Sequence, residues 1–382
     1  MVLKVARRAA IPPFIAMEVL RAANARAASG QGVYHLELGQ PDTPAPAPVI
    51  EAAKRALDSD RLGYTEALGI GPLREAIAGH YRQSYGLDIA PSRIVVTTGS
   101  SGAFMLGFLA AFEPGDRVAL AAPGYPAYRN ILLALDLRPI DLPVGPETRF
   151  QPTPAMLDEL HGPVEGLILA SPANPTGSML SPAELECLVA HCRNRGIRLV
   201  SDEIYHGIVY DGMAASAAAF SDTAIVVNSF SKYFCMTGWR LGWMILPPEL
   251  VDAVERLAQN LFISAPTLPQ MAALAVFGCK AELDANVARY RRNRDLLLAE
   301  LPKAGLQGFA PADGAFYLYA DVATLTNDSE AFCRRMLAEA GVAVTPGTDF
   351  DSERGHRSLR ISFAGSTDDM AEAARRLIRW LA

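Results

Sequence analysis

The chain has 382 residues, of which 50% are hydrophobic and 20% are charged, and its formal net charge is −6. This mildly acidic chain has no Lys/Arg run of the kind that binds nucleic acid, so we expect no nucleic-acid partner. Its longest apolar stretch, residues 103–112, is about half of what a membrane-spanning helix needs. We therefore expect no membrane span and small metabolites as partners.

The cysteines are odd in number and widely spread, at positions 187, 192, 235, 279 and 333. This distribution predicts reduced, buried thiols in a cytoplasmic protein rather than a disulfide framework. Cys187, His191 and Cys192 lack the paired spacing that zinc prefers, so no metal site is predicted. Charged residues also follow the N-terminus too closely for the apolar core of an export signal.

The N-terminal part predicts helices separated by a proline-rich connector. A helix is expected over residues 16–28, where Ser29 and Gly30 end it. The connector spans residues 41–48, and a second helix is expected over residues 49–58. We expect a domain boundary close to the connector.

Between residues 93 and 246, apolar runs of strand length alternate with helical patterns. This alternation predicts an α/β fold in which helices sandwich a mostly parallel, seven-stranded sheet. The expected strands are 94–97, 118–121, 138–142, 167–170, 198–201, 224–228 and 239–246. One helix start is distinct, because Ser181, Pro182 and Glu184 form a capping-box pattern, and Gly196 ends that helix.

The pattern changes after a loop at residues 260–268 and two helices at residues 269–278 and 281–301. The remaining chain predicts an α+β arrangement, with strands at 315–320, 342–345 and 359–363 and helices at 329–340 and 367–381. We therefore expect two domains, a large one of residues 40–280 and a smaller one built from residues 1–39 and 281–382.

Four predicted strands run into small or polar residues that can carry chemistry. Ser100, Asn174, Asp202 and Lys232 each follow a different strand. Open α/β sheets bind ligands outside the carboxyl ends of their strands, so one ligand can contact all four residues. A lysine just after a core strand is either a surface residue or a Schiff-base nucleophile.

Four ordered motifs complete this pattern, namely Pro-Ala-Asn174-Pro-Thr-Gly, Asp202-Glu-Ile-Tyr205, Ser229-Phe-Ser-Lys232 and Gly238-Trp-Arg240-Leu-Gly. With them the chain resembles, over nearly its whole length, the class I/II aminotransferases among the fold type I pyridoxal-phosphate enzymes, which are related to aspartate aminotransferase. The resemblance implies pyridoxal 5′-phosphate as cofactor. It also implies a ping-pong cycle through pyridoxamine phosphate that moves an amino group between an L-amino acid and a 2-oxo acid.

The resemblance assigns roles around the cofactor ring. Lys232 is implied to bind the aldehyde and to move the substrate proton. Asp202 is implied to pair with the pyridine nitrogen and to keep it protonated. Tyr205 and Asn174 are implied to hydrogen-bond the ring 3-oxygen, and Tyr125 to stack on the ring.

The phosphate is implied to bind at a helix start, where free N–H groups and the helix dipole suit an anion. Arg240 offers a planar fork that clasps phosphate in two places. The other implied phosphate ligands from the same subunit are Ser100, Ser101, Gly102, Ser229 and Ser231. Tyr64 is implied to reach the phosphate bound by a neighbouring subunit, which predicts a homodimer with shared sites.

The resemblance also implies three substrate-binding residues. Arg360 corresponds to the arginine that grips the substrate α-carboxylate, and Gly39 and Asn174 are expected beside it. Some aspartate-specific relatives carry a lysine in the loop that opens the phosphate helix, where this chain has Ser-Ser-Gly-Ala at residues 100–103. The sequence shows no other obvious cation for a side-chain carboxylate, although the partner subunit could supply one. This difference favours neutral or aromatic amino donors.

Two other functions are compatible with parts of this pattern. A pyridoxal-phosphate-dependent C–S β-lyase, or another elimination or decarboxylation enzyme, would use the same cofactor residues. A transcriptional regulator with an aminotransferase-like domain would need a preceding DNA-binding domain, and here the resemblance begins close to residue 1. The acidic charge also disfavours that third function.

Overall fold

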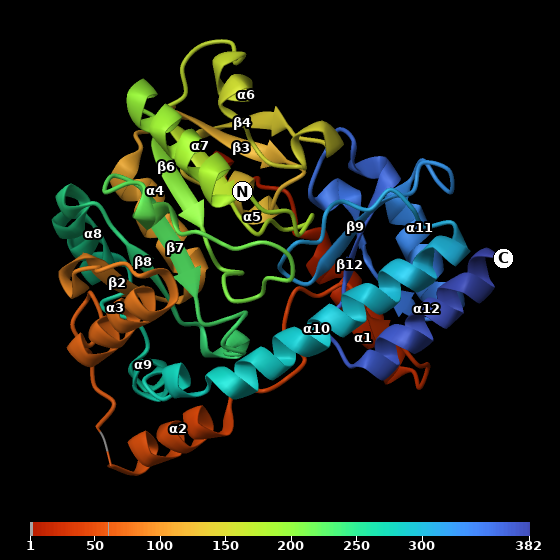
Figure 1. Ribbon diagram of the computed structural model, residues 1–382, viewed down its shortest axis with the longest axis horizontal. Coiled ribbons are helices and arrows are strands. Elements are labelled where there is room, and N and C mark those ends of the chain that lie inside the picture. The colour runs from red at the N-terminus through yellow and green to blue at the C-terminus, as the bar shows by residue number, and fades with distance from the viewer. Residues whose placement is uncertain (1–2, 60) are drawn as a thin grey trace.

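A seven-stranded sheet forms the centre of the computed structural model, which describes residues 3–59 and 61–382 (Figure 1). The strand order is β2-β8-β7-β6-β5-β3-β4; β8 is antiparallel to both of its neighbours, and the other pairs are parallel. The strands are β2 (Ile94–Thr97), β3 (Arg117–Ala122), β4 (Arg138–Pro143), β5 (Gly166–Ala170), β6 (Arg198–Asp202), β7 (Ile225–Ser229) and β8 (Gly242–Ile245). The predicted mostly parallel seven-stranded sheet is confirmed.

Helices cover both faces of this sheet because its strands are buried on both sides. Along β7, Ile225 and Val227 pack in a cluster with α4, whereas Val226 packs in the cluster on the opposite face. The helices of this part are α2 (Ala47–Ser59), α3 (Gly71–Tyr85), α4 (Gly99–Ala111), α5 (Pro126–Ala134), α6 (Pro154–Asp158), α7 (Pro182–Arg195), α8 (Pro248–Leu261) and α9 (Thr267–Ala273).

The two ends of the chain meet in a smaller α+β part. There β1 (Tyr34–His35) pairs in parallel with β10 (Val342–Ala343). A second sheet has the order β11-β12-β9 and is antiparallel. Its strands are β9 (Tyr317–Asp321), β11 (Thr345–Pro346) and β12 (Ser358–Ser362), and the helices are α1 (Ile15–Ala28), α10 (Lys280–Glu300), α11 (Ser329–Arg335) and α12 (Thr367–Leu381).

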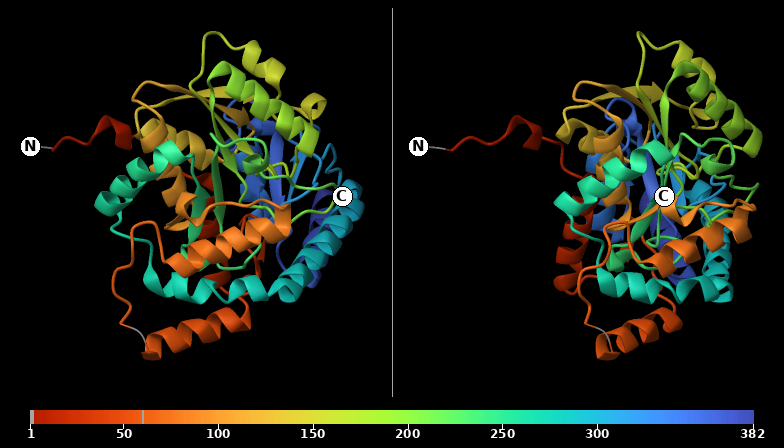
Figure 2. Two further views of the ribbon diagram at one scale, coloured as in Figure 1. Left: turned by 60° about the vertical axis from the view of Figure 1, so that its left-hand side comes forward. Right: turned by 90° about the vertical axis from the view of Figure 1, so that its left-hand side faces the viewer.

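Figure 1 shows α10 running from the region of α9 into this smaller part. In both views of Figure 2, the segment that precedes α1 extends away from the rest of the chain. No helix within the described ranges is long and apolar enough to span a membrane.

Three predicted elements were wrong in their extent. The single strand expected at 342–345 is two short strands in different sheets, because β10 pairs with β1 and β11 pairs with β12. The strand expected at 239–246 begins at Gly242, because a turn of 3-10 helix precedes it and Arg240 adopts a left-handed φ of 54°. The helix expected at 269–278 ends at Ala273 and is followed by a 3-10 turn.

The predicted helix caps are confirmed. Ser181 Oγ accepts a hydrogen bond from Glu184 N at 3.3 Å, and Glu184 Oε2 accepts one from Ser181 N at 2.7 Å. Gly196 ends α7 with a φ of 68°, which glycine adopts without steric cost. The cysteine prediction is only partly right, because four thiols are buried and Cys187 is exposed on the outer face of α7.

Candidate active site

A cleft with a cavity volume of about 200 Å³ lies at the carboxyl edge of the large sheet. The loops after β2, β5, β6 and β7 bring predicted residues together there, and β12 adds another from the smaller part. The predicted residues that line the cleft are Gly39, Ser100, Ser101, Tyr125, Asn174, Asp202, Tyr205, Ser231, Lys232, Arg240 and Arg360.

Three predicted residues lie outside this lining. Ser229 is buried, and its hydroxyl contacts Ser231 Oγ at 2.7 Å and the carbonyl of Leu241 at 3.0 Å. Gly102 lies inside α4. Tyr64 is 83% exposed, on the surface of its own subunit.

Lys232 projects its amine into the cleft, where Nζ donates a hydrogen bond to the carbonyl oxygen of Gly39. Burial, together with the positive charges of Arg360 and Arg240, lowers the pKa of Lys232 to about 8. A substantial fraction of the amine is therefore neutral near physiological pH, and a neutral amine is a nucleophile.

Asp202 is a buried carboxylate at the end of β6. Burial raises its pKa to about 6, and hydrogen bonds from Tyr128 and Ile204 N oppose that rise, as does the positive charge of Lys232. The carboxylate therefore remains mostly ionised at neutral pH, despite its apolar surroundings.

The N-terminus of α4 and Arg240 form a cradle for an anion. No side chain of the described residues caps this helix and its first turn holds no acid, so its N–H groups remain available. Arg240 is exposed to the cleft and donates one hydrogen bond, from Nη1 to the carbonyl of Thr237 at 3.0 Å. Gly99 has a φ of 70°, and a Cβ at this position would meet Arg240 Nη2 at 2.6 Å. The left-handed φ favours glycine here, and a larger residue would displace the guanidinium.

Arg360 is 2% exposed and lies between two aromatic rings, with its guanidinium carbon 4.5 Å from the centre of Tyr317 and 4.8 Å from that of Phe350. Its nitrogens donate to Asn174 Oδ1 and Thr345 Oγ1, each at 3.1 Å. Its Nε has no hydrogen-bond partner among the described residues. A buried guanidinium with an unused donor suits a carboxylate ligand.

Tyr317 connects Tyr205 and Gly39. The hydroxyls of Tyr205 and Tyr317 are 2.7 Å apart, and a Cβ at Gly39 would overlap the hydroxyl of Tyr317. A glycine is therefore required at position 39 for the chain to pass this ring.

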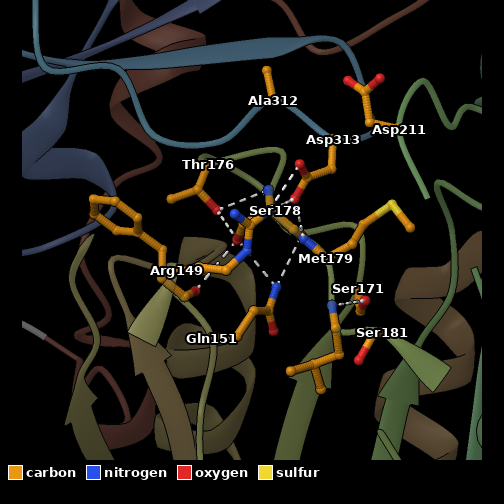
Figure 3. A network of polar contacts seen from close by, with 12 residues as sticks. Arg149, Gln151, Ser171, Thr176, Ser178, Met179, Ser181, Asp211, Ala312 and Asp313 are labelled. Carbon is orange, nitrogen blue, oxygen red and sulfur yellow. Dashed lines mark hydrogen bonds and ion pairs between the residues drawn. The ribbon is translucent and has the colours of Figure 1, made fainter. Parts of the chain in front are cut away.

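A polar network holds the loop that carries Asn174 (Figure 3). Gln151 Nε2 donates to the carbonyl of Ser178 at 2.9 Å and to its hydroxyl at 3.2 Å. Asp313, from the segment before β9, accepts a hydrogen bond from Met179 N at 3.2 Å. The loop is thus fixed from both the large sheet and the smaller part.

The comparisons with known proteins agree with this geometry. The profile of the family "Aminotransferase class I and II" matches residues 31–377. The chain belongs to this family. A valine–pyruvate aminotransferase of Mycobacterium tuberculosis is 50% identical to it over 382 residues, which are 99% of this chain and 98% of the relative.

Two solved aminotransferase structures match this chain almost completely. A crystal structure of an aminotransferase from Mycobacterium tuberculosis has a TM-score of 0.98 at 50% identity and covers 100% of this chain and 99% of its own. Aspartate aminotransferase from Thermus thermophilus with maleate has a TM-score of 0.92 at 33% identity and covers 99% and 100%. This chain is therefore an aminotransferase.

Sequence reasoning missed several residues that line the cleft of this aminotransferase, notably Phe14, Glu37, Tyr128 and Tyr317. Tyr128 lies three positions after Tyr125, at the start of α5, and that helical spacing was a usable signal. Glu37 lies at a bend after β1, and Tyr317 begins β9. Packing against distant parts of the chain brings both to the cleft, so no local pattern marked them as site residues.

Proposed function

We propose that this aminotransferase binds pyridoxal 5′-phosphate in the cleft and transfers an amino group between an L-amino acid and a 2-oxo acid by a ping-pong cycle. The observation that carries this proposal is the meeting of three groups in one cleft: the amine of Lys232, the buried carboxylate of Asp202 and the guanidinium of Arg240. Bound there, the cofactor supplies an aldehyde for amine exchange and a ring that accepts electrons from the substrate carbon.

Lys232 holds the cofactor aldehyde through its Nζ and afterwards moves the proton at the substrate Cα. Its lowered pKa supports both roles, because the neutral amine is needed as nucleophile and as base. Asp202 would pair with the ring nitrogen and favour its protonated form, because the carboxylate is mostly ionised at neutral pH.

The phosphate group binds in the cradle formed by α4 and Arg240. Ser100, Ser101 and Gly102 provide the helix start, and Ser229 and Ser231, whose hydroxyls are 2.7 Å apart, are the proposed hydroxyl ligands. This assignment fits the uncapped helix and the exposed guanidinium, which together offer directed donors and positive charge.

The ring and the substrate are oriented by the remaining residues. Tyr125 would stack on the ring, and Tyr205 and Asn174 would hydrogen-bond its 3-oxygen. Arg360 binds the substrate α-carboxylate beside Gly39 and Asn174, which is supported by the unused donor of its buried guanidinium.

Neutral amino acids are the proposed donors. The relative that is 50% identical is named a valine–pyruvate aminotransferase, so valine and pyruvate are the first substrates to test. The serines at positions 100 and 101 support this choice, because they place no cation in the cleft for a side-chain carboxylate.

The proposed assembly is a homodimer in which Tyr64 completes the partner's phosphate site. Tyr64 is 83% exposed. Its loop is nevertheless anchored, because Thr267 Oγ1 donates to the carbonyl of Gly63 at 2.6 Å and Thr65 N donates to Ser264 Oγ at 3.4 Å. An exposed aromatic residue on an anchored loop is suited to contact a second subunit.

We also propose that residues 40–280 form the large domain, and residues 1–39 with 281–382 the small one. Leu36, Leu297 and Leu377 share one core, apart from the two clusters that cover the large sheet. The free thiols of the cysteines fit a cytoplasmic location.

The test is an absorbance titration of the purified holoenzyme with single amino acids in the absence of any 2-oxo acid. Transamination predicts conversion of the pyridoxal band to the pyridoxamine band, with one 2-oxo acid released per site. The Lys232→Ala variant should not turn over. Continued release of 2-oxo acid and ammonia beyond one equivalent would instead identify an elimination enzyme.

A further inference from the structure

We propose that Tyr317 is a positioning residue for the cofactor: its hydroxyl donates to the hydroxyl of Tyr205, so that the proton of Tyr205 is directed to the 3-oxygen of the pyridoxal phosphate ring. This inference rests on the proposed function, because it takes from it that Tyr205 hydrogen-bonds the 3-oxygen. It goes further by giving the smaller part of the molecule a role in holding the cofactor ring.

The two hydroxyls are in direct contact although they come from different parts of the fold. Tyr205 follows β6 of the large sheet, and Tyr317 is the first residue of β9. Their oxygens are 2.7 Å apart, and both residues line the cleft. Tyr205 is 4% exposed and Tyr317 is 1% exposed within one subunit, so a second subunit is not needed to form this contact.

The hydroxyl of Tyr317 is held in place from several sides. In β9, Tyr317 pairs with Ser362 of β12. The guanidinium carbon of Arg360 lies 4.5 Å from the centre of its ring. A Cβ at Gly39 would overlap the hydroxyl, so the glycine provides the space that the hydroxyl occupies. The hydroxyl of Tyr317 therefore has little freedom to move away from that of Tyr205.

A count of protons leaves one donor of this pair for the cofactor. Each hydroxyl carries one proton, and within residues 3–59 and 61–382 the only hydrogen bond of either hydroxyl is the one that joins them. One proton is used in that bond, and the other remains for a third group. When Tyr205 gives its proton to the ring 3-oxygen, its own oxygen can only accept, so Tyr317 has to donate.

This direction also strengthens the donor that serves the cofactor. A hydroxyl that accepts a hydrogen bond becomes a better donor, because the bonds of a chain polarise one another. In the opposite direction, Tyr205 would present only its lone pairs to the 3-oxygen and would repel it. The hydroxyl of Tyr317 thus decides whether Tyr205 stabilises the 3-oxygen.

Asn174, the other proposed partner of the 3-oxygen, is oriented in a similar way. Its Oδ1 accepts a hydrogen bond from Arg360 Nη1 at 3.1 Å, which leaves the amide N–H groups free to donate. Arg360 belongs to β12, the neighbour of β9. Adjacent strands of the smaller part therefore orient both side chains that would donate to the 3-oxygen.

The experiment compares the binding of pyridoxamine phosphate and 3-deoxypyridoxamine phosphate to the full-length apo-protein. The two ligands differ only in the ring 3-oxygen, and neither has an aldehyde that reacts with Lys232. The Kd of the deoxy compound divided by that of pyridoxamine phosphate, both from equilibrium dialysis, measures the preference for the 3-oxygen. It is determined for the wild type, Tyr205→Phe, Tyr317→Phe and the double variant.

Tyr319→Phe is the matched control. It also removes the hydroxyl of a buried tyrosine, two positions further along β9, and this residue is not part of the cleft lining. The preference for the 3-oxygen should therefore be the same in Tyr319→Phe as in the wild type.

We expect the wild-type protein to prefer pyridoxamine phosphate, and Tyr205→Phe to reduce that preference by about tenfold, because the ionised 3-oxygen loses a donor. Tyr317→Phe should reduce it by about threefold, because Tyr205 remains but is no longer oriented and polarised. Adding Tyr317→Phe to Tyr205→Phe should cause no further loss, because a residue that acts through Tyr205 has no effect in its absence.

The outcomes separate this inference from the proposed function. An unchanged preference in Tyr317→Phe, or a further loss in the double variant, would overturn the inference and leave the role of Tyr205 standing. An equal loss in Tyr319→Phe would also overturn it, because the effect would then come from the strand and not from the hydroxyl. If the wild type did not distinguish the two ligands, the inference and the role of Tyr205 would both fail, and if it bound neither ligand, the proposed cofactor site itself would fail.

Discussion

The hydroxyl of Tyr128 donates a hydrogen bond to Oδ2 of Asp202, the carboxylate that we place beside the cofactor ring nitrogen. Ile204 N donates to the other oxygen, Oδ1, at 3.0 Å. Both donors stabilise the ionised carboxylate and oppose the burial that raises the pKa of Asp202 to about 6. Tyr128 thus helps to keep the carboxylate charged and oriented at neutral pH.

Replacing Tyr128 by Phe should raise the pKa of Asp202, because the ionised form loses a donor. The acid limb of the pH profile of kcat/KM should shift to higher pH by roughly one pH unit. Tyr81→Phe also removes a buried hydroxyl, one that accepts a hydrogen bond from Trp243 Nε1 at 3.3 Å, and should leave the limb in place. An unmoved limb in Tyr128→Phe would remove Tyr128 from the site.

The lowered pKa of Lys232 predicts how the apo-protein takes up pyridoxal phosphate. Uptake needs the neutral amine, so its rate should rise with pH through a midpoint of about 8, where Lys232 loses its proton in the folded protein. A lysine with the usual pKa would give a midpoint at about pH 10.4. Stopped-flow absorbance measures this rate, and a midpoint above pH 10 would contradict the assignment.

Arg240→Lys should weaken pyridoxal phosphate binding by about tenfold or more, because a lysine cannot clasp the phosphate in two places. Equilibrium dialysis of the apo-protein with pyridoxal phosphate measures the Kd. Binding of pyridoxal, which lacks the phosphate, should be nearly unchanged. Equal losses for the two ligands would show that the variant damages the whole cleft.

Hybrid dimers test whether Tyr64 acts in the partner's site. In a dimer of one Tyr64→Phe subunit and one Lys232→Ala subunit, the site that keeps Lys232 receives a native Tyr64 only if Tyr64 comes from the other subunit. That site should then bind pyridoxal phosphate as tightly as the wild type. Binding like that of the Tyr64→Phe homodimer would show that Tyr64 serves its own subunit or no site.

Ser181→Ala should lower the free energy of unfolding by about 1 kcal/mol, because the start of α7 loses its side-chain cap. Urea unfolding of the holoenzyme at fixed cofactor concentration measures this change. Ser352→Ala replaces an exposed serine in a turn outside the helices and strands, and is the comparison. An effect no larger than that of Ser352→Ala would show that the cap contributes little here.

The sheet and the four residues at its edge could be predicted from local sequence patterns. Apolar runs of strand length locate β2, β5, β6 and β7 to within a residue or two at each end. The carboxyl ends of these parallel strands meet at one edge for geometric reasons, so Ser100, Asn174, Asp202 and Lys232 had to come together. The capping pattern at Ser181 was equally local and equally readable.

The way in which the smaller part completes the cleft could not be predicted from local patterns. The hydroxyls of Tyr205 and Tyr317 meet although the residues are 112 positions apart, and Arg360 reaches the carbonyl of Glu37 across 323 positions. Such contacts depend on how two chain ends pack against a distant sheet. No residue pattern within a few positions encodes that packing, because the energy that fixes it comes from a core shared by both ends of the chain.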